Sequence, residues 1–195
     1  QMNFNPWTDL APVILVGSSS QMMVCNPSVP VKSLGDLIEL AKKSKLAYAS
    51  GGAGVPGHLA TELLLSMTGV NMLHVPYKGP APATTDVVAG QVPCGFLAAP
   101  TVIQHIKAGK LRALAVTPPQ RSSVAPDVPT MAESGLTGYE LSSWQAVFAP
   151  AGTPKALVDR LYTEIGKILK MPDVVKRLNA LGLDISGMPP AEFAA

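Results

Sequence analysis

The segment Tyr48–His58 reads YASGGAGVPGH, and the segment Leu73–Thr84 reads LHVPYKGPAPAT. In each segment, small residues follow a short apolar strand, and a proline lies near the start of the helix that comes next. Proline is favoured in a first helical turn, where its missing N–H leaves no hydrogen bond unmade. The two segments therefore predict two consecutive β-α units, each with a glycine-containing corner between strand and helix.

The alternation of strand and helix continues along the chain and predicts an α/β fold with mostly parallel sheets. Ser33 with Asp36 resembles a capping box before one helix, and Gly69 ends the next. Further helices are expected over Pro82–Ala89 and Pro100–Ala108, and another is expected to open at Pro154 after an N-cap at Thr153, with Leu157, Leu161, Ile165 and Ile168 as one apolar stripe. The expected strands are Pro12–Val16, Met22–Cys25, Leu46–Ala49, Met72–Val75, Val92–Leu97, Leu111–Thr117 and Tyr139–Phe148.

Composition narrows the class of protein. Of 195 residues, 47% are hydrophobic and only 14% are charged, which is typical of a chain with a well-buried core. The net charge of +2 is small and scattered, so no nucleic acid is expected as a partner. Apolar runs have strand length and not the length of a membrane span.

The two corners predict a binding site for a small anion. Unpaired backbone N–H groups at a helix start, at the positive end of the helix dipole, favour a negative charge. At the first corner Ser50 offers a hydroxyl, and Gly51, Gly52, Ala53 and Gly54 offer amides. A carboxylate that accepts several such bonds is stabilised without a cation.

The second corner supplies further candidates. Lys78 could pair with a ligand carboxylate or simply face water, and Gly79 would let the backbone approach the ligand. The candidates here are Tyr77, Lys78, Gly79 and Thr84. The structural alternative for Thr84 is local capping in the first turn of the helix.

The remaining reactive side chains do not form a catalytic or metal-binding set. His58 either faces the cleft and donates to a ligand or packs as a partly buried histidine. The histidines share no metal-ligand spacing, and no G-x-S-x-G nucleophile motif is present, so no metal, cofactor or enzyme activity is predicted. Cys25 and Cys94 both lie in expected strands, where unpaired buried thiols are favoured over a disulfide.

One alternative function comes from a different class. Gly52, Gly54 and Gly57 spell G-x-G-x-x-G between a strand and a helix, which is the pattern of NAD(P)-dependent oxidoreductases. Pro56 interrupts the motif where the helix should form, and the next strand ends in HVPYKG without an acidic residue for the ribose. The glycines could also serve only a tight turn.

Six blocks of sequence resemble a known family, the Bug-type receptors or TctC family of periplasmic solute-binding proteins for tripartite tricarboxylate transporters. The blocks are VCNPSVPVKSL (24–34), YASGGAGVPGHLATELL (48–64), HVPYKGPAPATTDVVAGQV (74–92), HIKAGKLRALAVT (105–117), PDVPTMAESGLTGYE (126–140) and SWQAVFAPAGTP (143–154). The resemblance implies a type II periplasmic-binding-protein fold, with two α/β lobes with parallel-rich sheets joined by two crossing strands. By this resemblance residues 1–20 hold a first-lobe remnant and the first crossing, 21–138 the second lobe, and 139–195 the second crossing and the C-terminal part of the first lobe.

The resemblance also implies a function. Such receptors capture a small carboxylate, such as a dicarboxylate or an aromatic acid, between the lobes in the periplasm and deliver it to membrane transporter subunits. It maps ligand contacts onto residues 50–54 with His58, and onto residues 77–79 with the following helix start. Leu97 stands where relatives often carry an acid, which favours a more apolar ligand. A signal peptide and a first-lobe segment of the family are not seen in this sequence, so we expect the chain to be a fragment.

Overall fold

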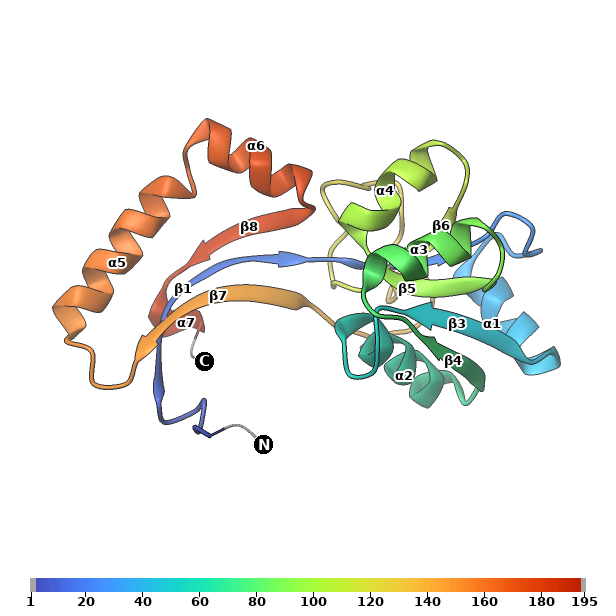
Figure 1. Ribbon diagram of the computed structural model, residues 1–195, viewed down its shortest axis with the longest axis horizontal. Coiled ribbons are helices and arrows are strands. Elements are labelled where there is room, and N and C mark those ends of the chain that lie inside the picture. Colours follow the sequence, from blue (N-terminus) through green and yellow to red (C-terminus); the bar gives the residue numbers. More distant parts are fainter. Residues whose placement is uncertain (1–2, 194–195) are drawn as a thin grey trace. The chain divides into compact units, whose positions relative to one another are not determined.

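The computed structural model describes residues 3–193 and divides the chain into two compact units (Figure 1). The five-stranded unit is Ser19–Ser143. The three-stranded unit combines Gln1–Ser18 with Trp144–Ala195. Both passages of the chain from one unit to the other fall at strands, β1 (Leu10–Ser19) and β7 (Ser143–Pro150).

The sheet of the five-stranded unit has the order β4-β3-β5-β2-β6. Its strands are β2 (Gln21–Cys25), β3 (Leu46–Ser50), β4 (Met72–Pro76), β5 (Cys94–Ala98) and β6 (Arg112–Val116). β3 runs parallel to β4 and β5, whereas β2 runs antiparallel to β5 and β6. Four of the five strands thus run in one direction and β2 runs in the other, which agrees with the expectation of a mostly parallel sheet.

Helices cover both faces of this sheet. The helices are α1 (Leu34–Lys43), α2 (Pro56–Thr68), α3 (Pro80–Val88) and α4 (Ala99–Lys107). Side chains of α1 and α2 pack in one core with Met23 and Cys25, and those of α3 and α4 pack in another with Met22 and Val24. Because successive strand residues point to opposite faces, β2 contributes alternately to two cores, and the unit has three layers.

Local signals fix the helix ends as the sequence predicts. The Ser33 hydroxyl accepts the Asp36 N–H, and the Asp36 carboxylate accepts the Ser33 N–H, which confirms the capping box. Gly69 follows α2 with φ of 69°, a left-handed conformation that glycine adopts without strain. Among the described residues, no helix is long and apolar enough to cross a bilayer.

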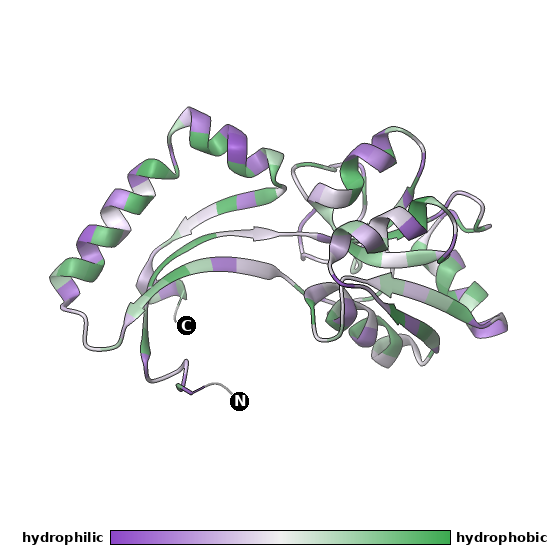
Figure 2. Cartoon of the chain, in the orientation of Figure 1, coloured by the Kyte–Doolittle hydropathy of each residue, from purple (hydrophilic) through white to green (hydrophobic). Residues whose placement is uncertain are grey.

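The three-stranded unit has the sheet order β7-β1-β8, with β8 at Leu183–Met188. Its helices are α5 (Lys155–Ile168), α6 (Pro172–Ala180) and α7 (Pro190–Phe193). Hydrophobic and hydrophilic residues alternate along α5 and α6, as expected of helices with one buried face (Figure 2). The core of this unit holds Val13, Ile14, Ala149, Val158 and Leu169.

Two details of α5 differ from the sequence prediction. The stripe expected on α5 is displaced: Val158, Tyr162, Ile165 and Leu169 pack in the core, and Leu157, Leu161 and Ile168 are exposed. The helix begins one residue later than expected, with Pro154 as its N-cap.

The expected strand Tyr139–Phe148 begins instead at Ser143. Tyr139 is buried outside the strand, where its hydroxyl donates to the carbonyl of Ala60 at 2.7 Å. The sequence predicts a strand at this tyrosine because aromatic residues are enriched in strands.

The two cysteines lie directly opposite each other on neighbouring strands. Cys25 of β2 pairs with Cys94 of β5 in the antiparallel register, and both are buried free thiols. Hydrogen bonding to Cys25 and burial raise the pKa of the Cys94 thiol. Since the thiolate is the reactive form, this environment keeps Cys94 in its unreactive state.

Gly95 is predicted to be essential for the close approach of β5 to β3. A Cβ atom at Gly95 would lie 2.5 Å from the carbonyl oxygen of Ala49. We expect Gly95→Ala to lower the free energy of unfolding by about 1–3 kcal/mol, because the strands must separate to accept the methyl group. Urea unfolding followed by circular dichroism measures the change.

The matched control is Gly35→Ala on the exposed side of α1, where the nearest atom to a new Cβ is the Ser33 hydroxyl at 3.7 Å. This substitution should raise stability by about 0.5–1 kcal/mol, because alanine restricts the unfolded chain. Equal effects of the two substitutions would contradict the packing argument.

Candidate ligand-binding pocket

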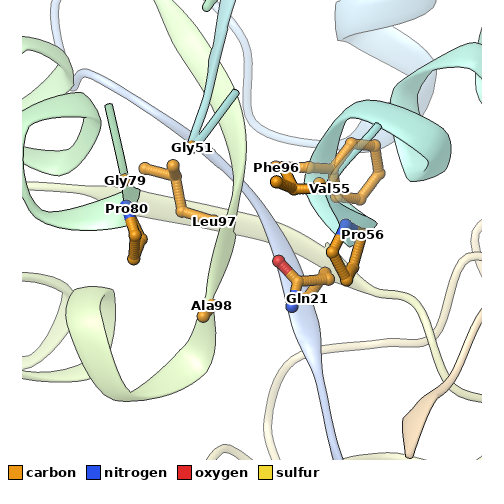
Figure 3. Close-up of a pocket in the computed structure, with 10 residues that line it drawn as sticks. Gln21, Gly51, Val55, Pro56, Gly79, Pro80, Phe96, Leu97 and Ala98 are labelled. Atoms are coloured by element: carbon orange, nitrogen blue, oxygen red, sulfur yellow. The ribbon is translucent and has the colours of Figure 1, made fainter. Parts of the chain in front are cut away.

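A cavity of about 300 Å³ opens in the five-stranded unit where β3 and β5 end and α2 and α3 begin (Figure 3). It is formed by residues from the ends of β3 and β5, from the starts of α2 and α3, and from β2. The lining residues are Gln21, Gly51, Val55, Pro56, Gly57, Gly79, Pro80, Phe96, Leu97 and Ala98.

The strand order explains why the cavity forms here. The chain leaves β3 to reach β4 on one side, and then crosses back to β5 on the other side of β3. Connections that leave neighbouring parallel strands in opposite directions open a crevice at the carboxyl ends of those strands. Gly51 follows β3, and Leu97 lies near the end of β5, so both belong to this crevice.

Two helix starts form part of the wall. Pro56 is the first residue of α2, and Pro80 is the first residue of α3. A Cβ atom on Gly57 would lie 2.3 Å from the carbonyl oxygen of Phe96, so only glycine allows α2 to approach β5 this closely. The positive ends of two helix dipoles therefore meet a cavity that has no cationic side chain in its wall.

Gln21 carries the only polar side chain among the ten lining residues, and none of the ten is ionisable. Its residue is only 6% exposed, and its side-chain amide has no hydrogen-bond partner within residues 3–193. Figure 3 shows the amide between Pro56 on one side and Leu97 and Ala98 on the other.

At the first corner, three of the predicted donors form hydrogen bonds within the segment 50–58. The Ser50 hydroxyl is buried, donates to the carbonyl of Gly52 at 2.9 Å and accepts the Gly52 N–H at 3.2 Å. The Gly54 N–H donates to Nδ1 of His58 at 3.1 Å. Ala53 is exposed at the tip, and Gly51 alone of the predicted residues 50–54 lines the cavity.

His58 belongs to a stack of rings and not to the cavity wall. Its ring lies 4.3 Å from that of His74, which lies 4.8 Å from that of Tyr48. Nε2 of His74 lies 2.7 Å from the Ser50 hydroxyl, and Glu62 accepts the Tyr48 hydroxyl at 2.9 Å. Of the two interpretations of His58, the structure supports packing.

At the second corner, one predicted residue lines the cavity and the other three do not. Gly79 lines the cavity, and its N–H donates to the carbonyl of Gly51 at 2.9 Å, which ties the two corners together. The Tyr77 hydroxyl donates to Asp86, and burial together with this bond raises the pKa of Tyr77 to about 12. Thr84 is buried and donates to the carbonyl of Pro80, while Lys78 is exposed.

Of the predicted site residues, the structure thus brings together Gly51, Gly79 and Leu97. Sequence reasoning did not select the lining residues Gln21, Val55, Phe96 and Ala98. They come from separate elements, and residues of these types are ordinary in strands and loops. The expected β-α corners were the available signal for the helix-start residues Pro56 and Pro80. No group of three or more histidine, cysteine, aspartate or glutamate side chains in residues 3–193 could hold a metal ion.

The layered α/β fold is like that of periplasmic binding proteins. The family model described as "Tripartite tricarboxylate transporter family receptor" (TctC) matches residues 1–193, and the chain belongs to this family. The chain is 40% identical over 189 residues to the "UPF0065 protein in tcbD-tcbE intergenic region" of Pseudomonas sp. strain P51, which covers 95% of this chain and 56% of that protein. It spans about half the length of the curated relatives it matches.

Solved structures agree on the fold. Rpa4515 of R. palustris with adipate has a TM-score of 0.84 and 36% identity, covering 99% of this chain and 65% of that one. MatC from Rhodopseudomonas palustris with bound malate has a TM-score of 0.82 and 28% identity, covering all of this chain and 68% of that one. The α/β fold expected from the sequence is thereby confirmed as that of TctC solute-binding proteins.

The ring stack predicts an acid-sensitive fold. Burial, and then the nearby His58, lower the pKa of His74 from its usual 6.5, while Glu62 acts in the opposite direction. Below pH 6.5 the unfolded chain binds a proton that folded His74 does not, so stability falls as the pH falls. We expect the melting temperature to drop between pH 7.5 and 5, and to drop less in His74→Gln.

His105→Gln on α4 is the control, since His105 lies outside the stack. Melting curves recorded at several pH values by differential scanning fluorimetry measure the effect. An identical pH dependence in the parent chain and His74→Gln would exclude His74 as its source.

Proposed function

We propose that the protein is a periplasmic solute-binding receptor that captures a small carboxylate in the pocket of the five-stranded unit. It would pass the solute to a tripartite tricarboxylate-type transporter. The observation that carries this proposal is a cavity at the carboxyl ends of β3 and β5, faced by two helix starts, in a chain of the TctC family. Ligand pockets of α/β sheets form at this position.

The chemistry of the pocket suits an acid with an apolar body. Side chains of Val55, Phe96 and Leu97 line it with Pro56 and Pro80, and these surfaces favour a hydrocarbon chain or ring. The starts of α2 and α3 favour a negative charge. Adipate and malate, found in two solved relatives, are both small dicarboxylates.

Capture without a reaction fits the same pocket. Its wall offers no nucleophile, general acid or general base, because no lining side chain is ionisable or carries a hydroxyl or thiol. The oxidoreductase alternative finds no support. The Gly52 and Gly54 amides are bound within the loop, and Gly57 is packed against Phe96.

Direct titration tests the proposal. We expect adipate or malate to bind the protein and to raise its melting temperature, because a ligand that binds only the folded state stabilises it. Isothermal titration calorimetry measures binding, with 1,6-hexanediamine as a control of similar length and opposite charge and with NAD as the test of the alternative. Binding of NAD, or no binding of either acid, would contradict the receptor proposal.

A substitution that fills the cavity tests its location. Ala98 lines the pocket and is partly exposed, so Ala98→Phe would place a ring in the ligand's space. We expect affinity for the acid to fall by at least about tenfold, since a filled cavity cannot bury the ligand. Ala89→Phe, at the exposed C-cap of α3, should leave affinity unchanged. Unchanged binding in Ala98→Phe would place the ligand elsewhere.

A further inference from the structure

We propose that Gln21 makes the pocket selective for carboxylic acids that carry no amino group. In this proposal, which rests on the receptor function above, the side-chain N–H of Gln21 donates to an oxygen of the bound acid. The same pocket rejects amino acids because it offers an ammonium group no counter-charge.

The first step is that the Gln21 amide is open to the cavity. The residue as a whole is buried, but its amide nitrogen and oxygen are not among the fully buried polar atoms that lack a partner in the described part of the chain. Gln21 is 6% exposed, has no partner for its side-chain amide in the described part of the chain, and faces the cavity. A ligand oxygen could accept a hydrogen bond from this amide in place of water, and desolvation would strengthen that bond.

The second step is that the backbone holds Gln21 rigidly in place. Its N–H donates to the Thr117 hydroxyl at 3.2 Å, and its carbonyl accepts the Thr117 N–H at 3.0 Å. On the other side Gln21 pairs with Ala98 in the register of β2 and β5. These bonds hold the backbone of Gln21 at the cavity, so its side-chain amide is presented to any ligand bound there.

The third step is charge. The cavity wall contains no carboxylate, and the starts of α2 and α3 present the positive ends of their dipoles. An ammonium group entering this cavity would lose its hydration without gaining an ion pair. A carboxylate would gain both the dipoles and the Gln21 amide.

A pair of matched ligands tests the selectivity. Adipate and 2-aminoadipate share the same carbon chain and both carboxylates, and they differ only in the ammonium group. We expect the parent protein to bind adipate at least about tenfold more tightly, because the ammonium group is desolvated without a partner. Isothermal titration calorimetry at pH 7.5 gives both constants.

Two substitutions at Gln21 test the residue. Gln21→Leu removes the donor at nearly constant volume and should weaken adipate by about tenfold, the effect of a lost hydrogen bond to a charged group. Gln21→Glu keeps the shape but adds a negative charge, so adipate should weaken further and the preference over 2-aminoadipate should shrink or reverse. Gln91→Leu, at an exposed position outside the cavity, is the matched control and should not change affinity.

The outcomes separate this inference from the proposed function. If acids bind the parent protein but Gln21→Leu binds adipate as tightly, or 2-aminoadipate binds as tightly as adipate, the inference is overturned and the receptor function stands. If no acid binds, the proposed function fails, and this inference fails with it. Should Gln21→Leu not fold, the ligand pair on the parent protein and on Gln21→Glu decides the question.

Discussion

The contact of Gly57 with the carbonyl oxygen of Phe96 is the constraint on which the pocket depends. Backbone lies directly on backbone here, with no space for even a methyl group. This contact seats the start of α2 against the end of β5 and so brings the helix dipole to the carboxyl edge of the sheet. A side chain at position 57 would push α2 away from β5 and widen or remove the cavity between them.

Next to this contact, the polar groups of the glycine-rich loop stabilise the loop itself. Ser50, His58 and His74 hold the segment 51–54 by hydrogen bonds and ring stacking. The loop is thus fixed before any ligand arrives, and preorganisation of this kind lowers the entropic cost of binding. The loop therefore forms part of the rim of the pocket. The one polar side chain among the lining residues comes from Gln21 on β2.

The apolar wall, the two helix starts and the single amide of the cavity suit the receptor role that we propose. Binding needs shape, burial and a few oriented polar groups. Membership of the TctC family and the two dicarboxylate-bound relatives agree with this interpretation of the site.

The sequence by itself determined the α/β class, the family, the capping box at Ser33 and the two β-α corners that border the pocket. These follow from periodicity, from turn residues and from motifs that act over a few positions, so they can be read without a fold. Of the site residues expected from the sequence, Gly51, Gly79 and Leu97 line the cavity, and the role of each in ligand binding stays a prediction. The displaced stripe of α5 shows the limit of periodicity, since two neighbouring stripes of that helix are apolar and only packing selects one.

Only the tertiary structure decided the rest. It set β2 antiparallel beside β5, which carries Gln21 into the cavity, and it turned the amides of Gly52 and Gly54 inward to partners within the loop. Whether a donor is free depends on acceptors that other parts of the chain bring within about 3 Å, and local sequence does not specify that proximity. The role of a glutamine in a strand cannot be predicted from local sequence, because the other residues around it come from separate strands and helices.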